Sequence, residues 1–201
     1  MISALNCNNL FNKCIGHYHI LDTIEQSFEP NVQESEIMQL LYRKCWIDTV
    51  QWHYEDLIRD PEIDPKQGMV LKRLIDSSNQ KRTDIVEQID DWFLAQFEGV
   101  ATVNNVTINT ESPAWVVDRL SILALKIYHM REQGGRDNVN PEHVQQAKRK
   151  LTVLLEQQTN LSVSFDQLLT DIGNGKRKMK VYRQMKLYND PATNPALYKN
   201  K

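Results

Sequence analysis

Apolar residues recur at helical spacing along most of this 201-residue chain, and only seven glycines and seven prolines interrupt them. Long segments with a period of 3.6 residues therefore dominate the pattern. Together with the residues that start and stop helices, they predict six helices. The expected ranges are 17–28, 34–59, 67–97, 112–133, 141–158 and a short helix at 164–173. We expect an all-α, single-domain bundle over residues 1–201, with 1–14 loose and a basic extended tail at 176–201.

The helix expected at 112–133 contains the most apolar stretch of the chain. Eleven of the sixteen residues in WVVDRLSILALKIYHM (115–130) are apolar, and they do not keep to one face. A helix that is apolar all round is buried between others, so we expect this one at the centre of the bundle. Burying a charge is costly unless it finds a partner or a ligand. The polar residues that interrupt this helix are Asp118, Arg119, Ser121, Lys126 and His129.

Polar side chains also fall on the buried faces of two neighbouring helices. Arg82 lies on the apolar stripe of the helix expected at 67–97. His53 and Asp56 are three residues apart, and therefore neighbours, within the apolar arc of the helix at 34–59. An inward arginine either forms a structural ion pair or grips a carboxylate or phosphate with two hydrogen bonds. The sequence leaves both alternatives open.

The formal net charge of −2 hides an asymmetry between the body of the chain and its end. Residues 173–201 hold eight Lys and Arg and one acidic residue, whereas residues 1–172 hold 16 basic and 25 acidic residues. A basic tail beside an acidic body is expected to dock on that body or on a protein partner. Tyrosines interleave with the basic residues, but no nucleic-acid-binding motif accompanies them, so we do not expect nucleic acid as a partner.

Several large functional classes lose support because their motifs are absent. The chain has no glycine-rich dinucleotide motif, no phosphate loop, no HExxH and no GxSxG. Cys7 and Cys14 with His17 and His19 match no compact zinc spacing, so we predict no metal ligand and name no cofactor. No run reaches the roughly 18 apolar residues of a membrane span. The N-terminus is also too polar for a secretory signal, and we expect a cytoplasmic protein.

Four stretches together resemble the uncharacterised bacterial family DUF4254 over about residues 15–198. They are WHYEDLIRDPEI (52–63), NQKRTDIVEQID (79–90), ESPAWVVDRLSILALKIYHM (111–130) and KVYRQMKLYNDPATNPALY (180–198). The resemblance implies a bacterial, helical, cytosolic protein with no established activity, in a family associated with cell-envelope polysaccharide genes. It assigns a catalytic role to no residue. The family positions that carry over are His53, Glu55, Asp56, Arg59, Asn79, Arg82, Asp84, Asp90, Asp118, Arg119, Lys126, Arg183 and Lys186.

These observations predict a binding protein for an anionic, phosphate-containing ligand such as a nucleotide or sugar nucleotide. The predicted ligand-binding residues are His53, Asp56, Arg59, Arg82, Asp118, Arg119, Lys126, Arg183 and Lys186. One alternative is a scaffold protein that docks a partner enzyme through its basic tail. A second alternative is a metal-dependent enzyme similar to the all-α nucleoside triphosphate pyrophosphohydrolases, which hold Mg²⁺ with helix-borne carboxylates. The acids available for that role are Glu55, Asp56, Asp84, Glu87 and Asp90.

Overall fold

The computed structural model describes residues 2–30, 35–185 and 190–198. Within these ranges the chain forms five long helices and one short helix, without strands. They are α1 (Ala4–Tyr18), α2 (Glu36–Leu57), α3 (Pro65–Gln96), α4 (Pro113–Gly134), α5 (Pro141–Gly173) and α6 (Pro195–Tyr198). The prediction of an all-α helical bundle is confirmed. None of the described helices is both long and apolar enough to cross a membrane.

Local sequence signals determine where α3, α4 and α5 begin. The side chains of Asp64, Ser112 and Asn140 each accept a hydrogen bond from a backbone N–H in the first turn of the helix that follows. Such a cap satisfies donors that have no partner inside the helix. Proline then occupies the first turn of each helix, where its missing N–H costs nothing and its fixed φ suits the helix.

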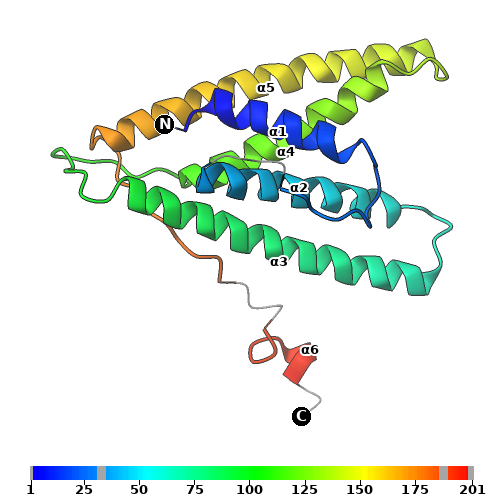
Figure 1. Cartoon of the computed structure of the whole chain (residues 1–201), viewed down its shortest axis with the longest axis horizontal. Helices are drawn as coiled ribbons and strands as arrows, with labels where there is room; N and C mark the ends of the chain where they lie inside the picture. The colour runs from blue at the N-terminus through cyan, green and yellow to red at the C-terminus, as the bar shows by residue number, and fades with distance from the viewer. Residues whose placement is uncertain (1, 31–34, 186–189, 199–201) are drawn as a thin grey trace.

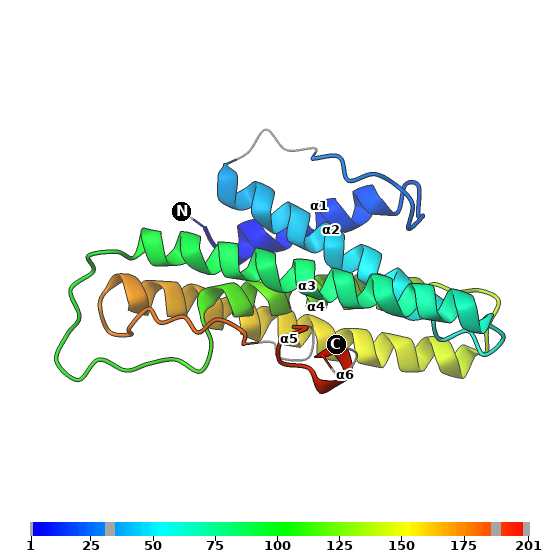
Figure 2. The ribbon, with the colours of Figure 1, turned by 90° about the horizontal axis from the view of Figure 1, so that it is seen from below.

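Helix α4 is the central element of the bundle (Figure 1). It contacts α1, α2, α3 and α5, and eleven of its 22 residues are buried. Helices α3 and α5 lie on opposite sides of it, and α1 and α2 pack side by side (Figures 1 and 2). The sequence of this helix is nearly all apolar because other helices pack against it on several sides.

Each of the other four long helices contributes a fully buried aromatic ring to one core. The rings are Phe11, Tyr42, Phe93 and Phe165, from α1, α2, α3 and α5. Phe93 and Phe165 meet edge to face, with ring centroids 6.3 Å apart, an arrangement that aromatic pairs favour. Burying one such side chain stabilises the fold by about 1.5–3 kcal/mol, so these rings hold the bundle together from both sides of α4.

Three of the helices expected from the sequence are wrong in position or length. The first helix is Ala4–Tyr18 rather than 17–28, and it includes residues 4–14, which were expected to be loose. Its buried face includes Cys7 and Cys14, which behave as small apolar residues there. The helices expected at 141–158 and 164–173 are one continuous helix, α5. Thr159, in the expected break, donates its hydroxyl hydrogen to the carbonyl of Leu155 one turn earlier, so it remains compatible with the helix.

The chain leaves α5 through a turn that only glycine fits. Gly175 has φ +69°, and a Cβ added there would lie 2.1 Å from the carbonyl oxygen of Ala101. The close approach lets Val103 N–H donate to the Gly175 carbonyl at 3.0 Å. The loop 99–111 is thereby joined to the beginning of the tail.

The described beginning of the basic tail continues along the body of the molecule. Arg183 donates to the carbonyl oxygen of Glu87 at 3.0 Å and forms an ion pair with Asp91. The backbone N–H of Gln184 donates to the Glu87 carboxylate at 3.2 Å. This part of the tail thus lies against the acidic face of α3, as expected from the opposite charges.

Asp90 on α3 carries a buried carboxyl group that is only partly satisfied. The residue is 1% exposed, and its Oδ1 has no hydrogen-bond partner among the described residues. Burial raises the pKa of Asp90 to about 6, although a hydrogen bond from Ser112 and the charge of Arg183 oppose the shift. Above this pH the folded protein holds a poorly compensated negative charge.

We predict that Asp90→Asn stabilises the protein near pH 7.5 by an amount on the order of 1–3 kcal/mol, the size expected for a shift of about two pKa units. Because the pKa of Asp90 is raised in the folded protein, the wild type loses free energy of unfolding relative to Asp90→Asn as pH rises from about 4 to about 6. Above about pH 6 the difference is constant. The free energy of unfolding of both proteins, measured by urea denaturation at pH 4.5 and 7.5, checks this. The exposed Asp84→Asn on the same helix is the control. An equal effect of Asp90→Asn at both pH values would contradict the prediction.

Candidate metal centre

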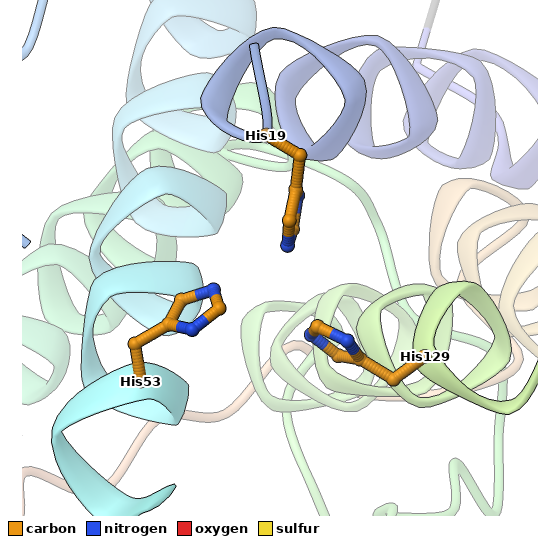
Figure 3. Close-up of side chains that lie close together, drawn as sticks. All are labelled: His19, His53 and His129. Carbon is orange, nitrogen blue, oxygen red and sulfur yellow. The ribbon is translucent and has the colours of Figure 1, made fainter. Parts of the chain in front are cut away.

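Three histidines point toward one another where α1, α2 and α4 meet (Figure 3). His19 directly follows α1, His53 lies on α2 and His129 on α4. One ring nitrogen from each lies within 4.8 Å of the other two. The Nε2 atom of every one of these rings is buried, and no group in the described part of the chain hydrogen bonds to it. Buried polar atoms without partners are rare and point to a missing ligand, water or ion.

Each of the three imidazoles also stacks on one aromatic ring. The stacked pairs are Tyr128 on His19 at 4.3 Å, Tyr18 on His53 at 5.1 Å and Trp52 on His129 at 4.9 Å between centroids. The three aromatic partners, Tyr18, Trp52 and Tyr128, lie on α1, α2 and α4. Such stacking restricts rotation of the imidazoles, so their orientation does not depend on a bound group.

Hydrogen bonds at the opposite nitrogens indicate which tautomer two of the histidines adopt. The Nδ1 of His19 lies 2.7 Å from the carbonyl oxygen of Ile15, and the Nδ1 of His129 lies 2.8 Å from the Glu132 carboxylate. Both oxygens only accept, so each Nδ1 carries the hydrogen when the ring is neutral. The lone pair is then on Nε2 and faces the cluster. This pairing of a ligand nitrogen with a carbonyl or carboxylate behind the ring is typical of metal-bound histidine.

Asp22 lies at the edge of the cluster. Its Oδ1 is 3.6 Å from His53 Nε2 and 3.9 Å from His19 Nε2, too far for hydrogen bonds. Its side chain is 57% exposed, so this edge is open to solvent. The backbone of Asp22 is left-handed, with φ 50°, a conformation that Asp adopts more readily than most residues. The turn after α1 therefore brings a carboxylate to the open side.

The surroundings of His53 favour its neutral form. Burial lowers the pKa of His53, and the nearby His19 and His129 add to this, while Asp22 and Asp56 act in the opposite direction. Neutral imidazole is the form that binds metal ions. In this form His53 can coordinate a cation.

A second polar cluster, which we call the ion-pair network, ties α2, α3 and α4 together. It consists of Lys44, Asp48, Arg82, Asp118 and Ser121. Lys44 Nζ lies 2.5 Å from Asp48 Oδ2 and 2.7 Å from Asp118 Oδ1. Arg82 reaches the other Asp48 oxygen through Nε at 2.7 Å and Asp118 through Nη2 at 3.2 Å. Ser121 donates to Asp48 at 2.6 Å.

The charges of the ion-pair network balance, two positive against two negative. Burial alone would raise the pKa of Asp118, but Lys44 and Arg82 outweigh it and the net shift is downward. Burial would likewise lower the pKa of Arg82, but Asp48 and Asp118 turn the net shift upward. Asp118 and Arg82 are therefore held in their charged forms, and the network supplies a structural link among three helices.

The structure divides the predicted ligand-binding residues among several places. Arg82 points inward as expected, and together with Asp118 it belongs to the ion-pair network. His53 belongs to the histidine cluster. Asp56, near the end of α2, and Arg59, in the turn that follows it, are exposed, and Arg59 pairs with Glu55 at 2.8 Å.

The other predicted residues that the structure describes lie on the surface. Arg119 pairs with Glu111, and Lys126 is exposed on α4. Arg183 is held on α3 by Asp91, and Lys186 lies outside the described residues. The eight described positions do not converge on one point, and anion binding by the predicted residues stays a prediction.

Sequence reasoning missed the partners of His53. His19 and His129 are 34 and 76 residues away along the chain, and no spacing rule joins residues on three separate helices. It also missed Lys44 and Asp48, although their separation of four residues places them on one helix face. A lysine and an aspartate beside Leu41 and Cys45 on an otherwise apolar face were the available signal.

The fold and the histidine cluster together define an all-α protein with a candidate three-histidine metal centre. Residues 38–181 match the sequence profile of the family described as Protein of unknown function (DUF4254), and the chain belongs to this family. The resemblance noted in the sequence is confirmed. No curated protein and no solved structure matches the chain. The matched range contains His53 and His129 but begins after His19.

We predict that Lys44→Met lowers the free energy of unfolding by about 3–5 kcal/mol, because it leaves an uncompensated buried negative charge. Adding Asp118→Asn restores the charge balance. The double variant should therefore lose less free energy of unfolding than the two single variants lose in sum. Urea denaturation measures all three proteins. Lys81→Met, at an exposed position on α3, is the matched control and should change little. Strict additivity of the two substitutions would show that the network does not act as a unit.

Proposed function

We propose that the protein binds one divalent transition metal ion, with zinc as the best fit, through His19, His53 and His129, and that it uses the ion in catalysis. The convergence of three buried, otherwise unpartnered Nε2 atoms carries this proposal. Imidazole nitrogen suits zinc and its neighbours in the first transition series. Three protein ligands with one further position for water form the usual arrangement of a catalytic zinc ion.

The spacing of the nitrogens is compatible with such an ion. Zinc–nitrogen bonds of about 2.0–2.1 Å place tetrahedral ligands about 3.3 Å apart, and the three ring nitrogens already lie within 4.8 Å of one another. The ring nitrogens would need to move by about 1 Å to bind the ion. Small side-chain rotations supply this without moving the helices, and the stacked aromatic rings prevent larger rotations.

Asp22 supports a catalytic rather than a closed structural site. Its Oδ1, 3.6–3.9 Å from two of the ligand nitrogens, lies on the solvent-exposed side where a metal-bound water would sit. A bound zinc ion lowers the pKa of its water to about 7. A metal ion held by His19, His53 and His129 would supply an activated water for hydrolysis, and the Asp22 carboxylate would accept the proton of that water.

A phosphate-bearing substrate, the ligand class expected from the sequence, fits this centre through the charge of the metal ion. The arginines predicted for that role already pair with carboxylates, as Arg59 does with Glu55 and Arg82 with Asp48. A metal ion at the histidine cluster would supply the missing positive charge and polarise a phosphoryl oxygen. A link to cell-envelope polysaccharide synthesis rests on the family resemblance alone.

We expect the purified protein, dialysed against Zn²⁺ and then against metal-free buffer, to retain one zinc ion per chain. His129→Ala and His53→Ala should each lower zinc affinity by more than about 10–100-fold, because even residues behind the ligands contribute that much. Atomic emission spectrometry and competition with a chromophoric chelator measure content and affinity. His143→Ala, which removes an exposed histidine outside the cluster, should leave both unchanged. Zinc retention by both cluster variants would overturn the proposed site.

A second prediction concerns the open position on the metal. With Co²⁺ in place of zinc, the visible spectrum should change with pH near about 7 as bound water ionises. Asp22→Asn should keep the Co²⁺ ion but shift this transition to lower pH, since removing the carboxylate charge removes its repulsion of the hydroxide that forms. Asn tolerates the left-handed backbone at this position nearly as well as Asp. A pH-independent wild-type spectrum together with loss of Co²⁺ from Asp22→Asn would instead identify Asp22 as the fourth ligand of a structural site.

A further inference from the structure

We infer that a separate pocket, formed by residues of α2, α3 and α4, binds an uncharged ligand that carries several hydroxyl groups, such as a polyol or a single sugar ring. The pocket has a volume of about 290 Å³. Gln51 and Arg82 lie in its lining with Trp52, and Asp56 and Arg59 also line it. We call it the α2–α3–α4 pocket.

Gln51, which lines the pocket, carries a buried acceptor that lacks a donor. Gln51 is 8% exposed, and its side-chain nitrogen donates to Asn79 Oδ1 at 2.8 Å. The carbonyl oxygen of the same amide, Oε1, is buried and has no hydrogen-bond partner among the described residues. An unsatisfied buried polar group costs about 1–3 kcal/mol. A ligand that donates a hydrogen bond to Gln51 Oε1 would recover this cost.

The opening of the pocket offers both acceptors and donors. Asp56 is exposed there and forms no hydrogen bond or ion pair within the described part of the chain. Arg59 uses only its Nη1 atom, on the Glu55 side chain and backbone carbonyl, so its other N–H groups are available. A ligand that fills the pocket therefore meets groups that need donors and groups that need acceptors.

A hydroxyl group matches this mixture better than the charged alternatives. A fully ionised phosphate cannot donate to Gln51, and three carboxylates in the lining outnumber the two guanidinium groups. An ammonium group cannot accept from Arg59, and it would lie near Arg59 and Arg82. A hydroxyl both donates and accepts. The apolar side chains of Trp52, Ile122 and Leu125 would cover the C–H surface of the ligand.

This pocket is separate from the proposed metal centre. Trp52 lies between them, because it stacks on His129 and also lines the pocket. No residue of the α2–α3–α4 pocket is among the three histidines. Ligand binding here consequently does not rest on metal binding, and the two proposals fail independently.

The test uses the full-length, ¹⁵N-labelled protein kept in chelator, so that the state of the metal centre does not enter. Glucose, galactose, N-acetylglucosamine and myo-inositol are titrated, with inorganic phosphate and ethylammonium as comparison probes. We expect saturable shifts of the Gln51 side-chain amide and Trp52 indole signals with at least one hydroxyl-rich probe. Asp56→Ala should weaken that binding by about ten-fold or more, the effect of losing a hydrogen bond to a charged group. Asp60→Ala, an exposed acid one turn away that is absent from the lining, should bind as wild type.

Two results would overturn the inference. One is the absence of shifts at these two side chains with all four hydroxyl-rich probes at concentrations that saturate weak, millimolar sites. The other is saturation of the same signals by phosphate or ethylammonium with higher affinity than by any hydroxyl-rich probe. Equal loss of binding in Asp56→Ala and Asp60→Ala would indicate a general charge effect and would also contradict the assigned contact.

Discussion

The ion-pair network at the junction of α2, α3 and α4 is the constraint on which the rest of the structure depends. Lys44 is completely buried and uses all three of its N–H donors, on Asp48, on the Asp118 carboxylate and on the Asp118 carbonyl oxygen. A buried lysine has few acceptable positions, because a small rotation of α2 would leave its charge without partners. The network therefore sets the rotation of α2 against α4. Gln51 and His53 follow on α2, and His129 on α4, at positions that this rotation determines.

Two kinds of buried polar group occur in this protein, and their hydrogen bonds distinguish them. In the ion-pair network both oxygens of Asp48 have charged or hydroxyl donors, which leaves no capacity for a ligand. The Nε2 atoms of the histidine cluster and Oε1 of Gln51 are buried without such partners. Satisfied groups of the first kind stabilise and orient helices, whereas groups of the second kind cost stability unless something binds them. Side chains that look alike in sequence therefore differ in the structure by how many hydrogen-bond partners they have.

Features that depend on local order could be predicted from the sequence, and features that depend on the meeting of distant helices could not. The proline and cap at Ser112 predicted the start of α4, and the inward position of Arg82 followed from periodicity. The sequence did not indicate what Arg82 would meet, since a bidentate carboxylate partner and a phosphate require the same side chain. The ligand role of His53 was likewise open, because its partners His19 and His129 come from other helices. The Asn- and Cys-rich α1 was misplaced because its polar face obscured the apolar positions.

The histidine cluster depends on the position of α1, whereas the α2–α3–α4 pocket does not. The α2–α3–α4 pocket lies wholly within residues 38–181, the range that matches the family, whereas the histidine cluster needs His19 from beyond it. Helix α1 already packs on α2 and α4 through apolar contacts, so the position of His19 is established by the core before any ion binds. A metal ion would then add a polar connection at the end of α1, where its last turn leads into the exposed Asp22. Because binding to the folded state alone stabilises that state, the ion would strengthen the junction of α1 with α2 and α4 while leaving the ion-pair network unchanged.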